Sequence, residues 1–484
     1  MEFHVSIGAG GTGARRDLAG QIYRQIREAI LDGRLRPGEA LPPSRELARR
    51  LEVSRNTVGA AYDRLAAEGY VDGRVGAGTF VSSGVRVAAR TPRREPPGGR
   101  LRPTATWSEI PPLPDLWRSF EYDFRAGLPD IRLFPFETWR RLVAAELRVS
   151  AVGSGMYGDP AGHPGLRAAI VRHIGVSRAV EATADDVFVT NGAQQAIDLI
   201  GRVLLEPGGR VAVENPGYRP PRRLFQSMGA RIAEIPVDPE GMVVDEIPAD
   251  TRIVYVTPSH QFPLGMPMSL RRRMALLDWA ERHGAVIVED DYDSEFRFSD
   301  RPLEPLQSLD RAGRVIYVGS FSKTLLPTLR LGFVVAPASL QPALLSAKQL
   351  SDWHGDPTTQ GALARFIDDG LLARHIRKAT KAYAARHERI VAGLTGELRE
   401  WLRLVPAAAG LHVCARLAPS ATVDVAAALR HARQDGMVAH DLAGFCAEPP
   451  GQSGIMLGFG AIQLDDIVAG LGVLARGIRA AVVG

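Results

Sequence analysis

Lys323 is the residue of this sequence best suited to covalent chemistry. The chain holds 59 lysine and arginine residues, and only Lys323 and three others are lysines. Only an amine forms an imine with an aldehyde, because a guanidinium stays protonated in a protein whereas a partly buried ammonium readily lowers its pKa. Ser320, Ser322 and Arg330, which surround Lys323 in the sequence, offer hydroxyls and a bidentate fork to a phosphate. The stretch therefore predicts a site for a phosphate-bearing aldehyde such as pyridoxal 5'-phosphate.

An acidic stretch, EDDYD at residues 289–293, supplies what such a cofactor needs at its other end. It follows an apolar run at 285–288 that reads as a buried strand. A carboxylate at a strand's carboxyl end can keep a pyridine nitrogen protonated, and we expect Asp290 to do so while Tyr292 bonds the ring oxygen. Alone, the cluster would be explained as well by a solvated loop or a metal site as by a cofactor contact. Its place one strand–helix–strand unit before Lys323 favours the cofactor.

Six motifs occur in an order that resembles the MocR-type regulators, a branch of the GntR family. In this branch a winged helix is fused to a fold type I aminotransferase-like domain that binds pyridoxal phosphate. The motifs are YGDPAG at 157–162, TNGAQQA at 190–196, ENPGY at 214–218, TPSHQFP at 257–263, EDDYDSE at 289–295 and SFSK at 320–323. The resemblance covers most of the chain.

The resemblance implies roles for several residues. Lys323 would carry the cofactor as an internal aldimine, Tyr218 would stack on its ring, and Tyr157 would reach the phosphate of a partner subunit. A head-to-tail, domain-swapped homodimer is implied, with each winged helix beside its partner's large domain. Directly repeated half-sites on double-stranded DNA are implied too.

Two positions depart from the aminotransferase pattern. Phe262 stands where an asparagine usually bonds the ring oxygen, and Met456 stands where an arginine commonly holds the substrate carboxylate. Without such an arginine an ordinary amino-acid substrate would be poorly anchored. The alternative carboxylate partners in the sequence are Arg222, Arg223 and Arg416.

The elements that must position the cofactor residues form an α/β domain. Strands alternate with helices after about residue 122, which is typical of a mostly parallel sheet, and a small C-terminal α/β subdomain is expected. After a strand at 187–190, Ala193 and Gln194 open a helix whose free N–H groups would bind the phosphate. A simple helix cap is the alternative reading.

An N-terminal helix-turn-helix is predicted from periodicity and capping. Apolar residues recur every fourth position from 18 to 30, Ser54 caps a third helix, and residues 70–81 form a wing with a glycine tip. Exposed polar residues there would contact DNA; they are Arg45, Arg55, Asn56, Thr57 and Gly78. The alternative for the arginines is an ordinary solvated helix position.

Four segments follow: a flexible leader at 1–14, the GntR-type winged helix at 15–83, a linker at 84–118 and the aminotransferase-like domain at 119–484. The leader contains a GxGxxG match at 8–13, but no second strand with a terminal acid follows it. The linker is rich in proline and arginine, and we expect either a solvated tether or an electrostatic contact to DNA.

Composition limits the class of protein. Two cysteines, Cys414 and Cys446, cannot build a disulfide framework, and no spacing suggests zinc, so no metal is expected. No apolar run of about 18 residues and no signal peptide occur, so a cytoplasmic protein without membrane contact is expected. The net charge of +5 and the pI near 9.3 permit DNA binding.

These inferences predict a pyridoxal phosphate-dependent transcriptional regulator rather than an enzyme. An amino compound or a B6 vitamer, sensed through Lys323, would be the effector. One alternative is a working aminotransferase that carries a DNA-binding domain. Another is a GntR-type repressor that senses a ligand without the cofactor.

Overall fold

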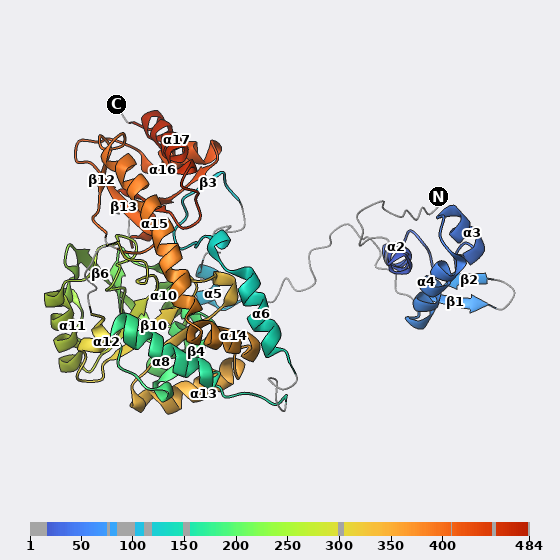
Figure 1. The fold of residues 1–484 in the computed structure, drawn as a ribbon, viewed down its shortest axis with the longest axis horizontal. Coiled ribbons are helices and arrows are strands. Elements are labelled where there is room, and N and C mark those ends of the chain that lie inside the picture. Colours follow the sequence, from blue (N-terminus) through green and yellow to red (C-terminus); the bar gives the residue numbers. More distant parts are fainter. Residues whose placement is uncertain are drawn as a thin grey trace. The chain divides into compact units, whose positions relative to one another are not determined.

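The computed structural model describes residues 17–74, 78–84, 102–110, 119–148, 155–298, 304–407, 409–447 and 452–482. The chain forms two compact units, Met1–Pro103 and Thr104–Gly484 (Figure 1). The leader predicted at 1–14 lies outside the described residues. No helix in the described ranges is long and apolar enough to cross a membrane.

The small unit is a winged helix-turn-helix, as predicted. Its elements are α2 (Leu18–Leu31), α3 (Ser44–Arg50), α4 (Arg55–Ala67) and the antiparallel strands β1 (Val71–Arg74) and β2 (Gly78–Val81). Ile22, Ile26 and Ile30 of α2 are buried, since a four-residue spacing places them on one helix face. The Ser54 hydroxyl accepts a hydrogen bond of 3.1 Å from the Thr57 amide and caps α4.

The large unit is built on an eight-stranded sheet of order β4-β11-β10-β9-β8-β5-β6-β7. Strands β10, β9, β8, β5 and β6 run parallel, whereas β11 is antiparallel to both of its neighbours. The bounds are β4 (Val187–Thr190), β5 (Arg210–Asn215), β6 (Arg231–Asp238), β7 (Gly241–Met242), β8 (Thr251–Val256), β9 (Val286–Asp291), β10 (Val315–Ser320) and β11 (Gly332–Val335).

Helices cover both faces of this sheet (Figure 1). On one face, α9 (Ala193–Leu204), α10 (Arg219–Ser227) and α13 (Gln341–Asp352) share a core with alternate strand residues. The other face packs against α6 (Phe136–Glu146), α8 (Pro164–Arg178), α11 (Leu270–His283), α12 (Leu306–Leu309) and α14 (Pro357–Asp368). Strands β4, β9, β10 and β11 are buried throughout, as expected for strands covered on both faces.

A smaller C-terminal subdomain completes the large unit. Its antiparallel sheet has the order β12-β13-β16-β15, with β12 (Leu402–Leu404), β13 (His412–Leu417), β16 (Gly454–Gly458) and β15 (His440–Asp441). Helices α15 (Leu371–Thr395), α16 (Val425–Gln434) and α17 (Asp466–Ala480) pack on it. Strand β3 (Tyr122–Asp123) pairs with β14 (Met437–Val438), so the start of the large unit is tied to this subdomain.

Two details differ from the sequence-based expectations. Strand β9 does not end before the acidic stretch but runs through Glu289, Asp290 and Asp291, which are all buried, so a solvated loop is excluded. In the predicted linker, residues 85–101 and 111–118 lie outside the described residues. Between them Ala105–Glu109 form a short helix, α5, that contacts α10.

Candidate cofactor site

A cavity of about 950 Å³, open to solvent, lies where β9 and β10 end and α9 begins. Nine of the ten side chains predicted to bind the cofactor line it, although they come from four separate motifs and, for Arg330, from outside them. They are Ala193, Gln194, Tyr218, Asp290, Tyr292, Ser320, Ser322, Lys323 and Arg330. Carboxyl ends of parallel strands meet at one sheet edge, and this brings the motifs together.

Lys323 follows β10 and extends into this cavity. Its Nζ donates a hydrogen bond of 2.8 Å to the Gly127 carbonyl, and a Cβ at Gly127 would lie equally close to Nζ. Burial lowers the pKa of Lys323, although the charges of Asp293 and Asp290 oppose the change. Lys323 therefore loses its proton more readily here than in water, and the neutral amine that results is the form that attacks an aldehyde.

Asp290 offers an unused oxygen to the same cavity. Its Oδ2 accepts a hydrogen bond of 2.5 Å from the Tyr255 hydroxyl, whereas its Oδ1 is buried without a partner among the described residues. Burial raises the pKa of Asp290 to about 6. A protonated ring nitrogen would satisfy Oδ1 and favour the ionised carboxylate, so this residue fits the predicted cofactor.

The start of α9 forms the phosphate end of the cavity. Gly192, with φ of +77°, precedes the helix, and no side chain caps it, so the N–H groups of Ala193 and Gln194 are open to an anion. The Arg330 guanidinium donates a hydrogen bond of 2.6 Å to the Asn191 carbonyl. A Cβ at Gly192 would lie 2.8 Å from this guanidinium, so glycine is needed for the approach.

A carboxylate on α13 braces this phosphate end, and the sequence did not indicate it. Asp352 Oδ2 accepts hydrogen bonds of 2.8 Å from both the Asn191 and the Gln195 side-chain amides. Its Oδ1 lies 2.5 Å from Nζ of Lys348, a lysine that is fully buried. The brace holds the loop between β4 and α9 in one geometry.

The ring end of the cavity is aromatic. Phe262 packs edge-on against Tyr218 and Tyr292, with ring centroids 5.3 and 6.0 Å apart. It offers no hydrogen bond where aminotransferases usually place asparagine. Tyr292 is thus left as the predicted partner of the ring oxygen, and its hydroxyl lies 2.9 Å from the His260 carbonyl oxygen.

Tyr157 is the predicted cofactor residue that does not line the cavity. Its side chain is 73% exposed and packs against Trp353, with ring centroids 4.6 Å apart. Its contact with the phosphate of a partner subunit remains a prediction.

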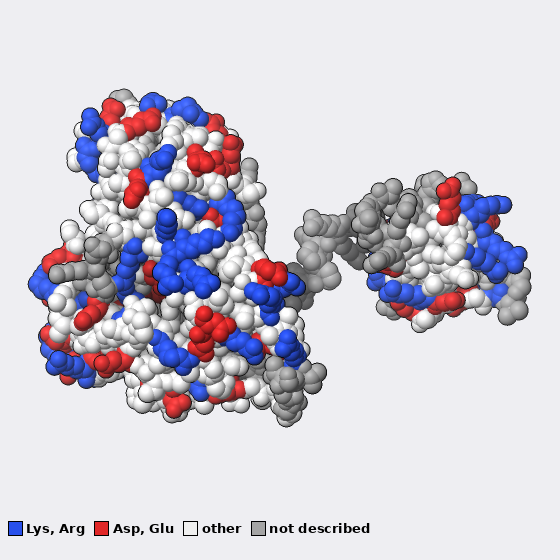
Figure 2. Space-filling view, viewed as in Figure 1, with Lys and Arg blue, Asp and Glu red and all other residues white. Residues whose placement is uncertain are grey.

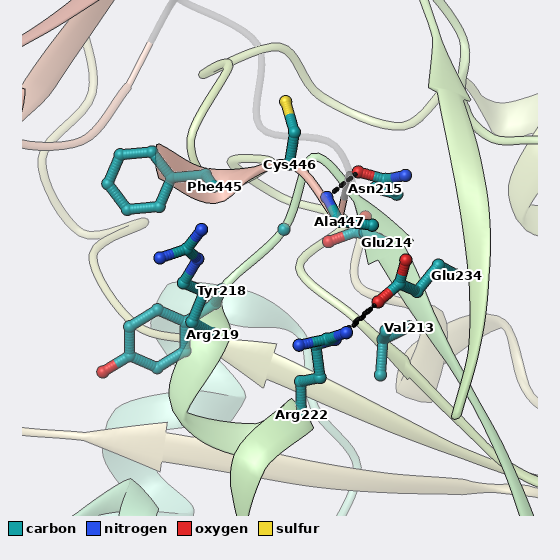
Figure 3. A pocket seen from close by; sticks show the side chains of 11 residues that line it. Val213, Glu214, Asn215, Tyr218, Arg219, Arg222, Glu234, Phe445, Cys446 and Ala447 are labelled. Atoms are coloured by element: carbon teal, nitrogen blue, oxygen red, sulfur yellow. Dashed lines mark hydrogen bonds and ion pairs between the residues drawn. The ribbon is translucent and has the colours of Figure 1, made fainter. Parts of the chain in front are cut away.

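Among the described residues, a methionine occupies the strand position predicted from the sequence to hold a substrate carboxylate. Met456 lies in β16, fully buried and paired with Cys414. Arg222 is bound to Glu234 at 2.5 Å and lines a small neighbouring pocket with Arg219 and Tyr218 (Figure 3). The Nε of Arg416 is buried without a partner among the described residues, and Arg223 is half-buried.

Further cavity residues were not among those predicted from the sequence. Gly127, Thr257 and His412 line the cavity, and Tyr255 lies behind Asp290. Thr257 belongs to a motif quoted above, so its presence was foreseeable. His412 lies in an unremarkable apolar stretch, and only the fold brings it near.

The predicted DNA contacts lie on the surface of the small unit. Arg45, Arg55 and Asn56 are exposed, and their side chains form no hydrogen bond or ion pair with another described residue. Thr57 is half-buried, and its hydroxyl lies 2.8 Å from that of Ser54, so it belongs partly to the cap. Gly78 begins β2 with φ of +114°. Figure 2 shows arginines gathered on the side where Figure 1 places α3, β1 and β2.

Comparisons with known proteins agree with this geometry. The bacterial regulatory proteins of the gntR family match residues 18–81, and the class I and II aminotransferases match residues 133–438. The probable rhizopine catabolism regulatory protein MocR of Rhizobium meliloti is 37% identical, over 94% of this chain and 92% of that protein. The pyridoxine biosynthesis regulator PdxR of Corynebacterium glutamicum is 33% identical, over 81% and 82%.

The solved structure of kynurenine aminotransferase from Pyrococcus horikoshii superimposes with a TM-score of 0.69 and 30% identity, covering 75% of this chain and 92% of that one. Membership of the class I and II aminotransferases confirms pyridoxal 5'-phosphate as the predicted cofactor. The chain belongs to the MocR-type branch of the GntR family, in which a GntR winged helix is joined to an aminotransferase domain of fold type I.

Proposed function

We propose that this chain is a DNA-binding transcriptional regulator that senses an amino compound or a B6 vitamer in its cofactor cavity. The observation that carries the proposal is the meeting of Lys323 with the unpaired Oδ1 of Asp290 in one cavity. When bound, pyridoxal phosphate would supply an electrophilic carbon, and an effector amine would compete with Lys323 for it. The small unit supplies the DNA contact.

The effector class follows from the chemistry of the cavity. An amine would compete with Lys323 for the cofactor, whereas a vitamer would fill the space that the cofactor itself uses. One relative is named as a regulator of pyridoxine biosynthesis and another as a regulator of rhizopine catabolism. Relatives of this architecture are thus named for different small molecules, and this supports sensing of either kind.

The chain's own residues argue for sensing over turnover. A buried methionine at position 456 cannot hold a carboxylate, and Phe262 cannot bond the ring oxygen. Sustained turnover needs a substrate held firmly through both half-reactions. The second candidate, an active aminotransferase, is favoured by the retention of Lys323 and Asp290 and by the solved aminotransferases of this fold.

Further parts of the proposal concern partners. We propose a head-to-tail homodimer, in which Tyr157 reaches the phosphate of the other subunit, acting on directly repeated half-sites in the cytoplasm. The exposed Tyr157 and Trp353 rings support such a contact, because large apolar side chains exposed together often mark an interface.

The test is an absorption spectrum of the protein with pyridoxal phosphate, beside Lys323→Ala, followed by single amines and vitamers. We expect a lysine-dependent band that one class of compound displaces without accumulation of keto acid. The same compound should change affinity for operator DNA. Continuous keto acid formation would establish the aminotransferase instead, and a wild-type band identical to that of the variant would remove Lys323 from the account.

A further inference from the structure

A buried polar cluster lies behind Tyr292 and is not explained by cofactor binding alone. The His260 Nδ1 lies 2.9 Å from Asp293 Oδ1 and 3.0 Å from the Tyr292 hydroxyl. His260 and Asp293 are each 2% exposed. Tyr292 lines the cavity, whereas the other two residues do not.

The partners fix the proton positions in this cluster. A carboxylate only accepts, so the ring proton of His260 must be on Nδ1, where it faces both Asp293 and the oxygen of Tyr292. Asp293 is itself anchored, since its Oδ2 accepts a hydrogen bond of 3.1 Å from the Leu411 amide. Because its oxygen accepts from His260, Tyr292 keeps its own proton; this proton is donated to the His260 carbonyl oxygen, 2.9 Å away, and the ring oxygen of a bound cofactor would take it over.

The fold makes room for this pair. Gly410 has φ of +86°, and a Cβ there would lie 2.0 Å from the His260 ring and 2.6 Å from Asp293 Oδ2. Any other residue at this position would displace one member of the pair. The contact between His260 and Asp293 therefore requires glycine at position 410.

The titratable groups near His260, among the described residues, come from the segment after β9, from β13 and from α15. Asp293 and Tyr292 follow β9, and the ring of His412 from β13 lies 4.6 Å from that of His260, tilted by 44°. Burial lowers the pKa of His412 to about 3, so this neighbour is neutral, and its Nε2 donates to the Pro263 carbonyl. His387 of α15 is the next histidine, and its pKa is lowered chiefly by burial, with a smaller contribution from His260.

The cluster has the donor types of a metal site, but its geometry is that of hydrogen bonds. One nitrogen or oxygen from each of His260, Asp293 and His412 lies within 4.8 Å of the others. The 2.9 Å between His260 and Asp293 already satisfies both atoms, and His412 is engaged with a carbonyl. A metal would have to break these bonds.

We infer that Asp293 and His260 are positioning residues that aim the Tyr292 hydroxyl at the ring oxygen of the bound cofactor. They thereby set the pH at which the lysine-bound cofactor changes protonation. The Tyr292 hydrogen bond matters more here than in a protein with asparagine at position 262, because the Phe262 side chain cannot donate a hydrogen bond to the ring oxygen. The inference rests on the cofactor site and is independent of what the effector is.

The test is a pH titration of the visible spectrum of the loaded full-length protein, with two variants at position 260. His260→Asn keeps an N–H donor near the place of Nδ1, whereas His260→Leu removes it. Without the Tyr292 hydrogen bond, less negative charge is drawn from the ring oxygen, so the lysine-bound cofactor keeps its proton up to a higher pH. We expect the midpoint of His260→Leu to rise by about one pH unit, a tenfold change, as for one lost hydrogen bond, and that of His260→Asn to stay near wild type.

Asp293→Asn separates positioning from a direct charge effect. The Asp293 charge raises the pKa of Lys323, so charge removal alone would lower the midpoint, whereas release of Tyr292 would raise it. We expect a rise, and no further rise when Tyr292→Phe is added. The inference would be overturned if the midpoint of Asp293→Asn fell, or if the effects of Asp293→Asn and Tyr292→Phe were additive. It would also be overturned by equal midpoints for the two His260 variants, or by a wild-type spectrum that changes with a chelator. If the wild type lacked any lysine-dependent band, both the proposed cofactor site and this inference would be wrong.

Discussion

Replacing Asp290 by asparagine should stabilise the cofactor-free protein while weakening its hold on pyridoxal phosphate. Asp290 is 3% exposed, and burial raises its pKa from an ordinary 3.8 to about 6. The folded chain therefore binds this proton more tightly than the unfolded chain does. It follows that the cost of ionising Asp290 is absent below about pH 4 and complete above about pH 6.

The magnitude follows from the size of the pKa change. At about 1.4 kcal/mol per pKa unit, a rise from 3.8 to about 6 corresponds to a destabilisation on the order of 3 kcal/mol above pH 6. Asparagine removes this cost and can still accept from the Tyr255 hydroxyl. For a domain of this size, about 1–2 °C per kcal/mol gives a rise in Tm of roughly 3–6 °C.

The assay is thermal unfolding of cofactor-free protein at about pH 8 and pH 5, beside the exposed-site control Asp278→Asn. The gain of Asp290→Asn should be present at pH 8 and shrink at pH 5, and the control should match wild type at both. With pyridoxal phosphate the order should reverse, because the variant cannot pair with a protonated ring nitrogen. A variant that is less stable than wild type at pH 8 without cofactor would refute the reasoning.

Three other predictions concern positions away from Lys323. Asp352→Ala should weaken pyridoxal phosphate binding by about tenfold, as for one lost hydrogen bond to a charged group, because the Asn191 and Gln195 amides lose their brace; equilibrium titration measures this, and unchanged affinity would contradict it. Arg178→Met should destabilise the large unit by about 3–5 kcal/mol, since it leaves the buried Asp291 without the guanidinium 2.6 Å away; denaturant unfolding tests this, with exposed Arg140→Met as the control. Asn56→Ala should relax base preference by about 1–3 kcal/mol at one operator position, whereas a uniform loss across all operator variants would make it a backbone contact.

The residues that follow strand ends could be predicted from the sequence because their neighbours in the chain determine them. A lysine among small hydroxyl residues after an apolar run, or a glycine before a helix, keeps its meaning in any α/β fold. Ser320, Ser322, Ala193 and Gln194 all line the one cavity, and their contact with the cofactor stays a prediction. The winged helix was predictable for a similar reason, since periodicity and a cap such as Ser54 act within one helix.

Long-range polar partners could not be predicted in this way. Asp352 braces Asn191 from a helix far along the chain, and Gly410 leaves space for His260 only after the two subdomains have packed. The strand was expected to end at residue 288, because strand propensity is low for carboxylates, whereas β9 continues through Asp291. The buried Arg178, whose partner Asp291 lies in β9, overrides that propensity.

The most direct test of the central claim is operator binding by fluorescence anisotropy, with and without candidate amines and vitamers, for the loaded wild type and Lys323→Ala. The account predicts that one compound changes the affinity of wild type for DNA and leaves that of the lysine variant unchanged. An equal response of both proteins, or steady keto acid production with no change in DNA affinity, would contradict the claim that the cofactor cavity controls the DNA-binding unit.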